Sequence, residues 1–316
     1  MIPVRRRRPP QPRRLSLPEF TARYATEDAC RAALFAARWP DGFRCPKCGG
    51  TRAYVLRDRA RYQCVDCRHQ ASVTAGTILH HSRVPLTKWF LAMYLDAESK
   101  RGISATELQH KIGVCFSTAR FLLFRLRSAM GQREARHLLR GVVQMDDAYY
   151  GGEGHGKVGR GTTRPKAVVA VSVNEREVPQ HLKVVLVRDF TQETVNDAVA
   201  RFVAQGAKIV SDGLNAFGGL ERAGFPHEAV PTNHLPEGVE PLPVVHTQIA
   251  NSKAWIGGTF HGLGPKHLQS YLDAFAFRFN RRRLQSVFER LVVACATSTP
   301  VPYPGTRKRP PALAAA

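Results

Sequence analysis

Four cysteines form two pairs whose spacing is typical of a metal site. Two residues separate Cys45 from Cys48 and Cys64 from Cys67, and fifteen residues lie between the pairs. Two such pairs can bring four thiolates to one tetrahedral Zn²⁺. The intervening segment 51–62 is expected to form a hairpin that is too small to fold without the metal. The sequence therefore predicts a structural zinc ribbon, and the joint occurrence of both pairs argues against a redox role.

Three aspartates lie at the ends of two segments that are predicted to be strands. Asp146 and Asp147 end the first segment, and Asp212 ends the second. If these strands are neighbours, Asp146 and Asp212 face one another and repel unless a cation neutralises them. Mg²⁺ or Mn²⁺ on carboxylate oxygens is the basis of two-metal phosphoryl transfer. The alternative is that Asp147 and Asp212 are turn residues, because Asp-Gly is a common turn dipeptide.

The elements that would position these aspartates follow Arg140, where the apolar period changes from helical to strand-like. The pattern predicts three strands, a helix and a fourth strand, at 142–149, 167–173, 182–187, 193–205 and 208–211. This is the order of the ribonuclease H-like fold, an α/β fold with a mixed sheet flanked by helices. The crossover should lay the fourth strand parallel to the first.

A helix-turn-helix is predicted upstream of the strands. Ser104 to Glu107 form a capping box, Gly113 ends the first helix, and a second helix begins near Ser117. The second helix carries three basic residues, Arg120, Arg125 and Arg127. These features indicate DNA binding, and the alternative is a helical hairpin used only for packing.

The composition is that of a globular protein with a large positive charge. The 316 residues include 47 Lys and Arg against 25 Asp and Glu, a net charge of +22, which favours polyanionic partners. No apolar run reaches the roughly 18 residues of a spanning helix, and no secretory signal is recognised at the start, so we expect a cytosolic protein without membrane association. Thiols stay reduced in that compartment, and the remaining cysteines, Cys30, Cys115 and Cys295, are expected to be buried.

Several segments together resemble a family of bacterial insertion-sequence transposases. Residues 143–152 resemble the first catalytic strand of that family, residues 210–213 the second, and residues 266–281 a C-terminal helix. The cysteine pairs and the helix-turn-helix occur in the same order, so the resemblance covers roughly residues 18–290. The chain is similar to the family numbered fifteen ninety-five, also called ISXO-two-like.

The resemblance implies a set of site residues. It makes Asp146 and Asp212 the first two magnesium ligands, with Asp147 where the family often has Glu. The segment 246–255 resembles the variant with Asn and a Lys two residues on, which implies Asn251 as the third ligand and Lys253 as its partner. A neutral amide binds metal less strongly than a carboxylate. Glu240 and Asp273 could substitute, and the alternative for Asn251 is a helix cap.

The resemblance also implies a function. The chain would bind the terminal inverted repeats of its insertion sequence, hydrolyse one strand at the ends and use the freed 3′-hydroxyl to attack target DNA, as a homo-oligomer in a synaptic complex on the bacterial nucleoid. DNA contacts are expected from the helix-turn-helix and from a basic loop with Lys157, Arg160 and Arg164. Two alternatives remain: an inactive DNA-binding relic or regulator, and a nuclease acting on RNA or junctions.

These features predict five regions along the chain. They are a basic disordered arm, a zinc ribbon module, a helix-turn-helix region, a ribonuclease H-like catalytic domain and a disordered tail, at residues 1–17, 18–80, 81–139, 140–298 and 299–316.

Overall fold

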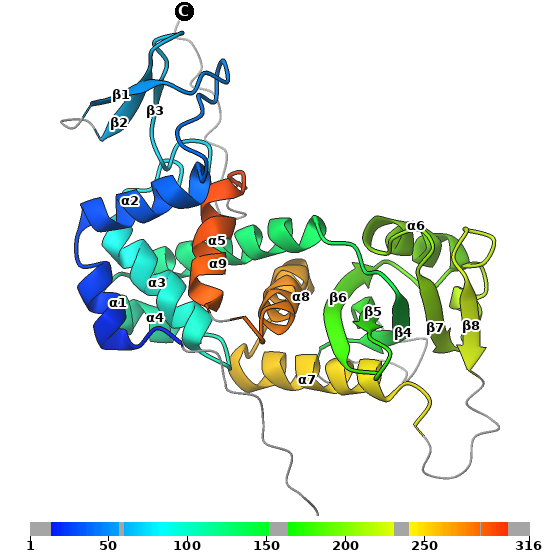
Figure 1. Ribbon diagram of the computed structural model, residues 1–316. Coiled ribbons are helices and arrows are strands. Elements are labelled where there is room, and N and C mark those ends of the chain that lie inside the picture. Colours follow the sequence, from blue (N-terminus) through cyan, green and yellow to red (C-terminus); the bar gives the residue numbers. More distant parts are fainter. Residues whose placement is uncertain (1–13, 57–59, 152–163, 231–239, 285, 303–316) are drawn as a thin grey trace, which may run out of the picture. The chain divides into compact units, whose positions relative to one another are not determined.

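A computed structural model describes residues 14–56, 60–151, 164–230, 240–284 and 286–302. Two compact units make up this part of the chain (Figure 1). The ribbon unit consists of residues 16–95, 105–129 and 288–302, and the sheet unit of residues 14–15, 96–104 and 130–287. The predicted arm, up to Arg13, and the end of the predicted tail lie outside the described residues.

The ribbon unit is built on helices around an aromatic core. They are α1 (Leu17–Arg23), α2 (Glu27–Arg38), α3 (Leu86–Glu98), α4 (Ala105–Ile112), α5 (Phe116–Ala135) and α9 (Val287–Thr297), of which α3, α5 and α9 extend across a unit boundary. Ser16 and Thr26 begin α1 and α2 by accepting hydrogen bonds from backbone amides of the first turn. The rings of Phe20, Tyr94 and Phe288 pack together, with centroids 4.3–6.0 Å apart. This core holds α1 to α3 and α9.

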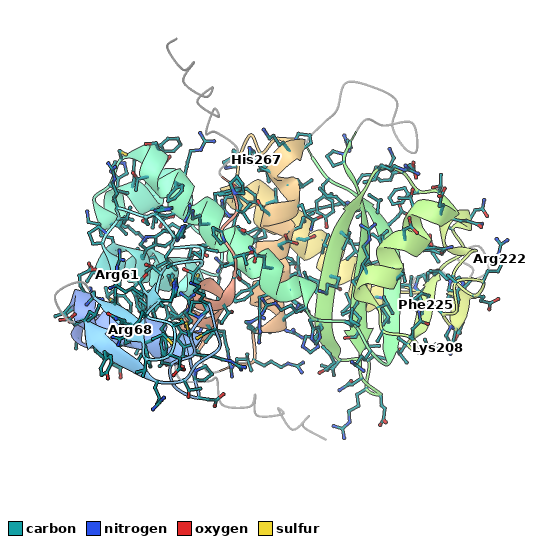
Figure 2. The ribbon with its side chains drawn as sticks, turned by 90° about the horizontal axis from the view of Figure 1, so that it is seen from above. Arg61, Arg68, Lys208, Arg222, Phe225 and His267 are labelled. Atoms are coloured by element: carbon teal, nitrogen blue, oxygen red, sulfur yellow. The ribbon has the colours of Figure 1, made fainter. Side chains whose placement is uncertain are left out.

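A three-stranded antiparallel sheet carries the cysteine pairs. Its strands are β1 (Ala53–Leu56), β2 (Arg61–Cys64) and β3 (Gln70–Ala71). β1 and β2 form the hairpin that was predicted between the pairs. Arg61 begins β2 and Arg68 lies in the connection between β2 and β3; both residues are exposed (Figure 2).

The predicted helix-turn-helix is present as α4 and α5. Gly113 adopts φ +61° immediately after α4, a left-handed conformation that ends the helix. Its carbonyl accepts a 2.7 Å hydrogen bond from Lys88 Nζ. Leu108 and Ile112 of α4 are buried, as are Leu122 and three further apolar residues of α5, namely Ala119, Leu123 and Leu126. The pattern therefore identified both helices and their buried face.

The sheet unit has the ribonuclease H-like topology. Its elements in chain order are β4 (Val142–Tyr149), β5 (Lys166–Val173), β6 (Pro179–Val187), α6 (Gln192–Phe202), β7 (Lys208–Asp212), η1 (Asn215–Phe217), β8 (His227–Val230), α7 (Pro243–Thr259) and α8 (Pro265–Asn280). The strand order is β6-β5-β4-β7-β8. β4, β5 and β6 are antiparallel neighbours, whereas β7 pairs in parallel with both β4 and β8. The predicted parallel crossover is confirmed.

Helices cover both faces of the five-stranded sheet (Figure 1). Alternate residues of β4 face opposite sides, so Val143 and Met145 pack with α6, while Ala148 and Tyr150 pack with α7 and α8. The polar residues Gln144 and Asp146 belong to the second set by the same alternation. The α7 face is therefore the one on which β4 presents a carboxylate.

The edge strand β6 is covered by side chains of α8. Asn280 Oδ1 accepts a 2.7 Å bond from the Leu182 amide, and Gln269 Oε1 accepts a 2.8 Å bond from the Leu186 amide. These amides would otherwise be unpaired at an open sheet edge. Asp273, one of the two carboxylates proposed as substitute ligands, lies in this region and accepts a 2.8 Å bond from Gln269. Burial raises the pKa of Asp273 to about 6.

Two sequence expectations differ from the structure. The helix predicted to reach residue 205 ends at Phe202, because Val203 is extended and pairs with Leu139. The prediction of a buried thiol is confirmed for Cys30 and Cys295 and is wrong for Cys115, which is exposed. Cys115 precedes the first turn of α5 instead of lying on its apolar face. No helix in the described part of the chain has the length and apolar character needed to cross a membrane.

Candidate functional site

The four paired cysteines converge on one point in the ribbon unit. Their sulfur atoms all lie within 4.8 Å of one another. Cys45 Sγ lies 3.6 Å from Cys67 Sγ, and Cys48 Sγ lies 3.6 Å from Cys64 Sγ. Four thiolates at about 2.3 Å from a tetrahedral Zn²⁺ are about 3.8 Å apart. The arrangement therefore fits a structural zinc ion with four sulfur ligands.

Tight turns place the two members of each pair together. Gly49 and Arg68 follow the pairs with φ +79° and +58°. The Gly49 amide donates to the Cys45 carbonyl at 2.9 Å, and the Arg68 amide donates to the Cys64 carbonyl at 3.1 Å. Both pairs therefore use the same turn, and the zinc geometry depends on contacts that are local in the sequence.

The second cluster is formed by aspartates on adjacent strands of the sheet unit. The parallel pairing of β4 with β7 runs from Val142 opposite Lys208 to Met145 opposite Ser211. One step further in this register sets Asp146 beside Asp212. Oxygen atoms of Asp146, Asp147 and Asp212 all lie within 4.8 Å of one another. The predicted juxtaposition of Asp146 and Asp212 is present.

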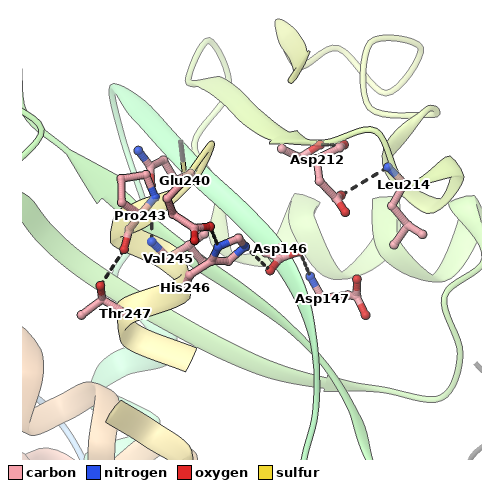
Figure 3. A network of polar contacts seen from close by, with 11 residues as sticks. Asp146, Asp147, Asp212, Leu214, Glu240, Pro243, Val245, His246 and Thr247 are labelled. Atoms are coloured by element: carbon pink, nitrogen blue, oxygen red, sulfur yellow. Dashed lines mark hydrogen bonds and ion pairs between the residues drawn. The ribbon is translucent and has the colours of Figure 1, made fainter. Parts of the chain in front are cut away.

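The surroundings of these carboxylates favour a divalent cation. Asp146 is 9% exposed, and burial, followed by the charge of Asp147, raises the pKa of Asp146 to about 6. The Asp147 amide donates to Asp146 Oδ1 at 2.8 Å, and the Leu214 amide donates to Asp212 Oδ1 at 3.2 Å (Figure 3). The carboxylates of Asp147 and Asp212 thus lie close to the buried carboxylate of Asp146. Carboxylate oxygens are ligands that suit Mg²⁺ or Mn²⁺.

Asp147 belongs to the cluster, although the site predicted from sequence did not include it. A strand places consecutive side chains on opposite faces. Here the parallel pairing of β4 with β7 ends at Met145, before the aspartates. Asp146 and Asp147 can therefore both bring an oxygen atom close to Asp212. The only sequence feature that could have indicated this role is that Asp146 and Asp147 are consecutive.

Helix α7 is attached to β4 at two points. The Val245 amide donates to Gln144 Oε1 at 3.3 Å, and Tyr150 Oη lies 2.7 Å from Ser252 Oγ. Both pairs join residues about a hundred positions apart in the chain. They fix the helix beside the strand, with the aspartates between the two attachment points.

This attachment brings His246 against the aspartates. His246 Nε2 lies 2.9 Å from Asp146 Oδ2, and the other ring nitrogen, Nδ1, contacts Glu240 Oε1 (Figure 3). The sequence analysis named Glu240 as a substitute ligand, and the structure connects it to Asp146 through His246. No role was predicted for His246, because nothing in its local pattern distinguished it from other histidines.

The residues expected to complete the site, Asn251 and Lys253, also lie on α7. Asn251 is inside the helix and exposed, so it is not a helix cap. Five residues after His246, it points about 140° around the helix from it. Lys253 is seven residues after His246 and lies on the same face of the helix. The residue is exposed, and its Nζ lies 6.0 Å from the centre of the Tyr150 ring.

The residues predicted to bind DNA have different environments. Arg120 is exposed near the start of α5. Arg125 donates to the carbonyls of Ile78 and His80, the latter at 2.8 Å, and Arg127 is only 7% exposed. The last two arginines are therefore used in packing the unit. Arg164 is half-buried two residues before β5, whereas Lys157 and Arg160 lie outside the described residues.

A ribonuclease H-like sheet with an acidic edge, joined to a zinc ribbon, defines a class of nucleic-acid-processing enzymes. A model of the ISXO2-like transposase domain matches residues 138–280, and a model of the transposase zinc-ribbon domain matches residues 25–70. Together these matches span more than half of the chain. The chain belongs to the ISXO2-like transposase family.

One curated relative comes from Halobacterium salinarum and is described as an uncharacterized protein in transposable element ISH50. It is 31% identical over 129 residues, which are 40% of this chain and 42% of that protein. The match therefore spans less than half of the relative's length. Among solved structures, the catalytic core domain of BIV integrase is 12% identical, with a TM-score of 0.28 over 42% of this chain and 80% of that one.

Proposed function

We propose that this chain is an active DNA transposase that binds the terminal inverted repeats of its element and catalyses strand cleavage and strand transfer into target DNA. The observation that carries the proposal is the cluster of Asp146, Asp147 and Asp212 at the edge of a ribonuclease H-like sheet. A protein that only binds DNA has no use for three carboxylates beside one another in a half-buried site. Their mutual repulsion makes sense if a divalent ion joins them.

Asp146 and Asp212 would hold the catalytic metal, Mg²⁺ or Mn²⁺. In two-metal phosphoryl transfer, one such ion would activate the attacking oxygen and a second would stabilise the leaving oxygen. Water attacks first at the element end, and the 3′-hydroxyl that is released then attacks the target strand. Lys253, exposed beside Tyr150, would contact a phosphate of the strand being cut. Asn251 remains the third ligand implied by the family resemblance.

The ribbon unit would provide the recognition of the element ends. The second helix of a helix-turn-helix enters the major groove with its first turns. In α5 these turns expose Phe116, Ser117 and Arg120. The ribbon adds exposed basic side chains at Arg61 and Arg68 (Figure 2). Two ends must be joined in one reaction, so we propose that a homo-oligomer assembles on them.

An assay on DNA carrying the element ends tests the proposal. With Mg²⁺ or Mn²⁺, the wild-type chain should nick the end and join it to target DNA, while Asp212→Ala should bind the same DNA without cutting it. Asp197→Ala is the matched control, because Asp197 is an exposed aspartate of α6 in the same unit. End-specific binding by a wild-type chain that neither cuts nor joins would favour the inactive relic or regulator instead.

A further inference from the structure

We propose that His246 is a metal ligand of the acidic site and that Glu240 is the residue that orients it. The inference rests on the proposed function, because it concerns the same ion. It adds an imidazole nitrogen to the ligand set implied by the family resemblance. It also changes which divalent ion the site should prefer.

The distance between His246 and Asp146 supports shared ligation. Two ligand atoms about 2.1 Å from one octahedral ion, and at right angles, lie about 3 Å from each other. His246 Nε2 and Asp146 Oδ2 are 2.9 Å apart. An ion can therefore bind both atoms after only small movements of the two side chains. Asp146 would then connect this position to the cluster it forms with Asp147 and Asp212.

Glu240 supports the ligand role of the ring. Metal-binding histidines commonly donate the hydrogen on their second nitrogen to a carboxylate, which fixes the tautomer and the orientation of the ring. Glu240 Oε1 contacts His246 Nδ1 and leaves Nε2 directed toward Asp146 (Figure 3). The carboxylate of Glu240, the imidazole of His246 and the carboxylate of Asp146 are therefore linked by contacts in that order. This is the pattern expected around a metal held by Nε2.

The backbone around His246 gives the arrangement rigidity. His246 directly follows Val245, whose amide is bonded to Gln144 on β4. Gln144 and Asp146 face the same side of that strand. The hydrogen bond that joins the two elements is therefore one residue from His246 on the helix and two residues from Asp146 on the strand. Asn251 has a different position, since it is exposed and about 140° around α7 from His246.

A nitrogen ligand predicts an ion preference. Mg²⁺ favours oxygen donors, whereas imidazole is a good ligand for transition-metal ions. The site should therefore bind Mn²⁺ more tightly, relative to Mg²⁺, than an all-oxygen version of the same site would.

Pulsed electron paramagnetic resonance of Mn²⁺ bound to the zinc-loaded full chain gives a direct test, because a coordinated ring nitrogen couples to the electron spin. The wild type should show this coupling, and ¹⁵N-labelled histidine should change it. His246→Ala should remove it. His227→Asn is the matched control: His227 Nε2 lies 2.9 Å from Ser211 Oγ on the neighbouring strand, and its loss should leave the coupling intact.

Two further variants separate ligation from a structural role. His246→Glu offers oxygen in place of nitrogen, so it should keep Mn²⁺, lose the nitrogen coupling and shift the preference toward Mg²⁺. Glu240→Ala should weaken Mn²⁺ binding by about 10- to 100-fold, and Glu240→Gln should restore part of it, because Gln still accepts the ring hydrogen.

The outcomes distinguish this inference from the proposed function. Mn²⁺ binding that requires Asp212 but shows no histidine coupling, or coupling that survives in His246→Ala, would overturn the ligand role and leave the transposase proposal standing. An absence of Mn²⁺ binding would overturn both. A wild-type preference for Mn²⁺ that is unchanged in His246→Glu would also contradict the inference.

Discussion

The two clusters of candidate metal ligands in this chain are built in opposite ways. The four cysteines lie in two short turns within 23 residues of sequence, and their sulfur atoms already have nearly tetrahedral spacing. The acidic cluster combines β4 and β7, more than 60 residues apart, and α7 adds His246 another 34 residues on. The first is a closed site that folds a small module, and the second is an open site that depends on a sheet formed independently of it.

This difference has a consequence for metal removal. A site with four protein ligands and no core of its own loses its fold with the metal. A site at the edge of a five-stranded sheet, with apolar cores on both faces, keeps its fold and loses only its chemistry. The two metals should therefore be separable by mutation and by chelation.

The largest effect is expected for the zinc ligands. Cys64→Ser removes a fully buried ligand, so zinc should fall well below one equivalent per chain and the ribbon should unfold, since zinc binding contributes on the order of 10 kcal/mol to such modules. Elemental analysis and hydrogen exchange measure the two changes. Cys115→Ser is the control, because that thiol is exposed and is not one of the four clustered cysteines, and this variant should keep its zinc. Full zinc content in Cys64→Ser would contradict the assignment.

The next effect separates chemistry from fold in the sheet unit. Asp146→Asn and Asp212→Asn should each reduce single-turnover cleavage by about a thousandfold or more, because several kcal/mol of charge stabilisation depend on the ion. The melting temperature should stay unchanged or rise, since each change removes a repelling charge. DNA binding should persist. If both variants unfolded as the cysteine variant does, the contrast between the two sites would be wrong.

An intermediate effect should appear as the pH is lowered. The pKa of Asp146 is raised from 3.8 to about 6, so the folded chain holds a proton there between these values. A metal must displace that proton, and Mn²⁺ affinity should be level above pH 6 and fall about tenfold per unit below it. By the same linkage, the metal-free sheet unit should lose stability as the pH rises from about 4 to 6. Titrations between pH 5 and 7.5 measure the affinity; a constant affinity across this range would refute the shift.

The smallest effects are expected on α7, outside the carboxylates. Asn251→Ala should have a milder effect than either aspartate change, because a neutral side chain contributes little electrostatic stabilisation. Lys253→Ala should weaken cleavage more than binding, since its ammonium would contact the reacting strand. Cleavage rates and DNA dissociation constants for both variants test this order. A loss in Asn251→Ala as large as in Asp212→Asn would contradict this order and make Asn251 as important a ligand as the aspartate.

Sequence reasoning succeeded where the pattern was local or followed the order of elements. Cys45 to Cys67 could be recognised because zinc ligands in a ribbon depend on spacing alone. Asp146 and Asp212 could be placed together because the order of strands and helix required β4 and β7 to pair. The strand 142–149 was predicted with the bounds that the structure has.

Sequence reasoning was insufficient where a contact between distant parts of the chain determines the environment of a side chain. His246 and Glu240 depend on how α7 lies against β4, and that depends on hydrogen bonds such as Gln144 to Val245 across about a hundred residues. Arg125 looked like a phosphate contact on a helix surface, yet it binds carbonyls of a preceding loop. Neither fact leaves a periodic signal in the sequence.

The central claim is that one chain holds two independent metal sites, a closed thiolate site and an open carboxylate site. Titration of the zinc-loaded full chain with Mn²⁺, followed by electron paramagnetic resonance together with zinc analysis, tests it most directly. We expect Mn²⁺ to bind the wild type while zinc stays at one equivalent, and Asp212→Asn to lose Mn²⁺ affinity without losing zinc. Equal Mn²⁺ binding by the wild type, Asp146→Asn and Asp212→Asn would contradict the claim.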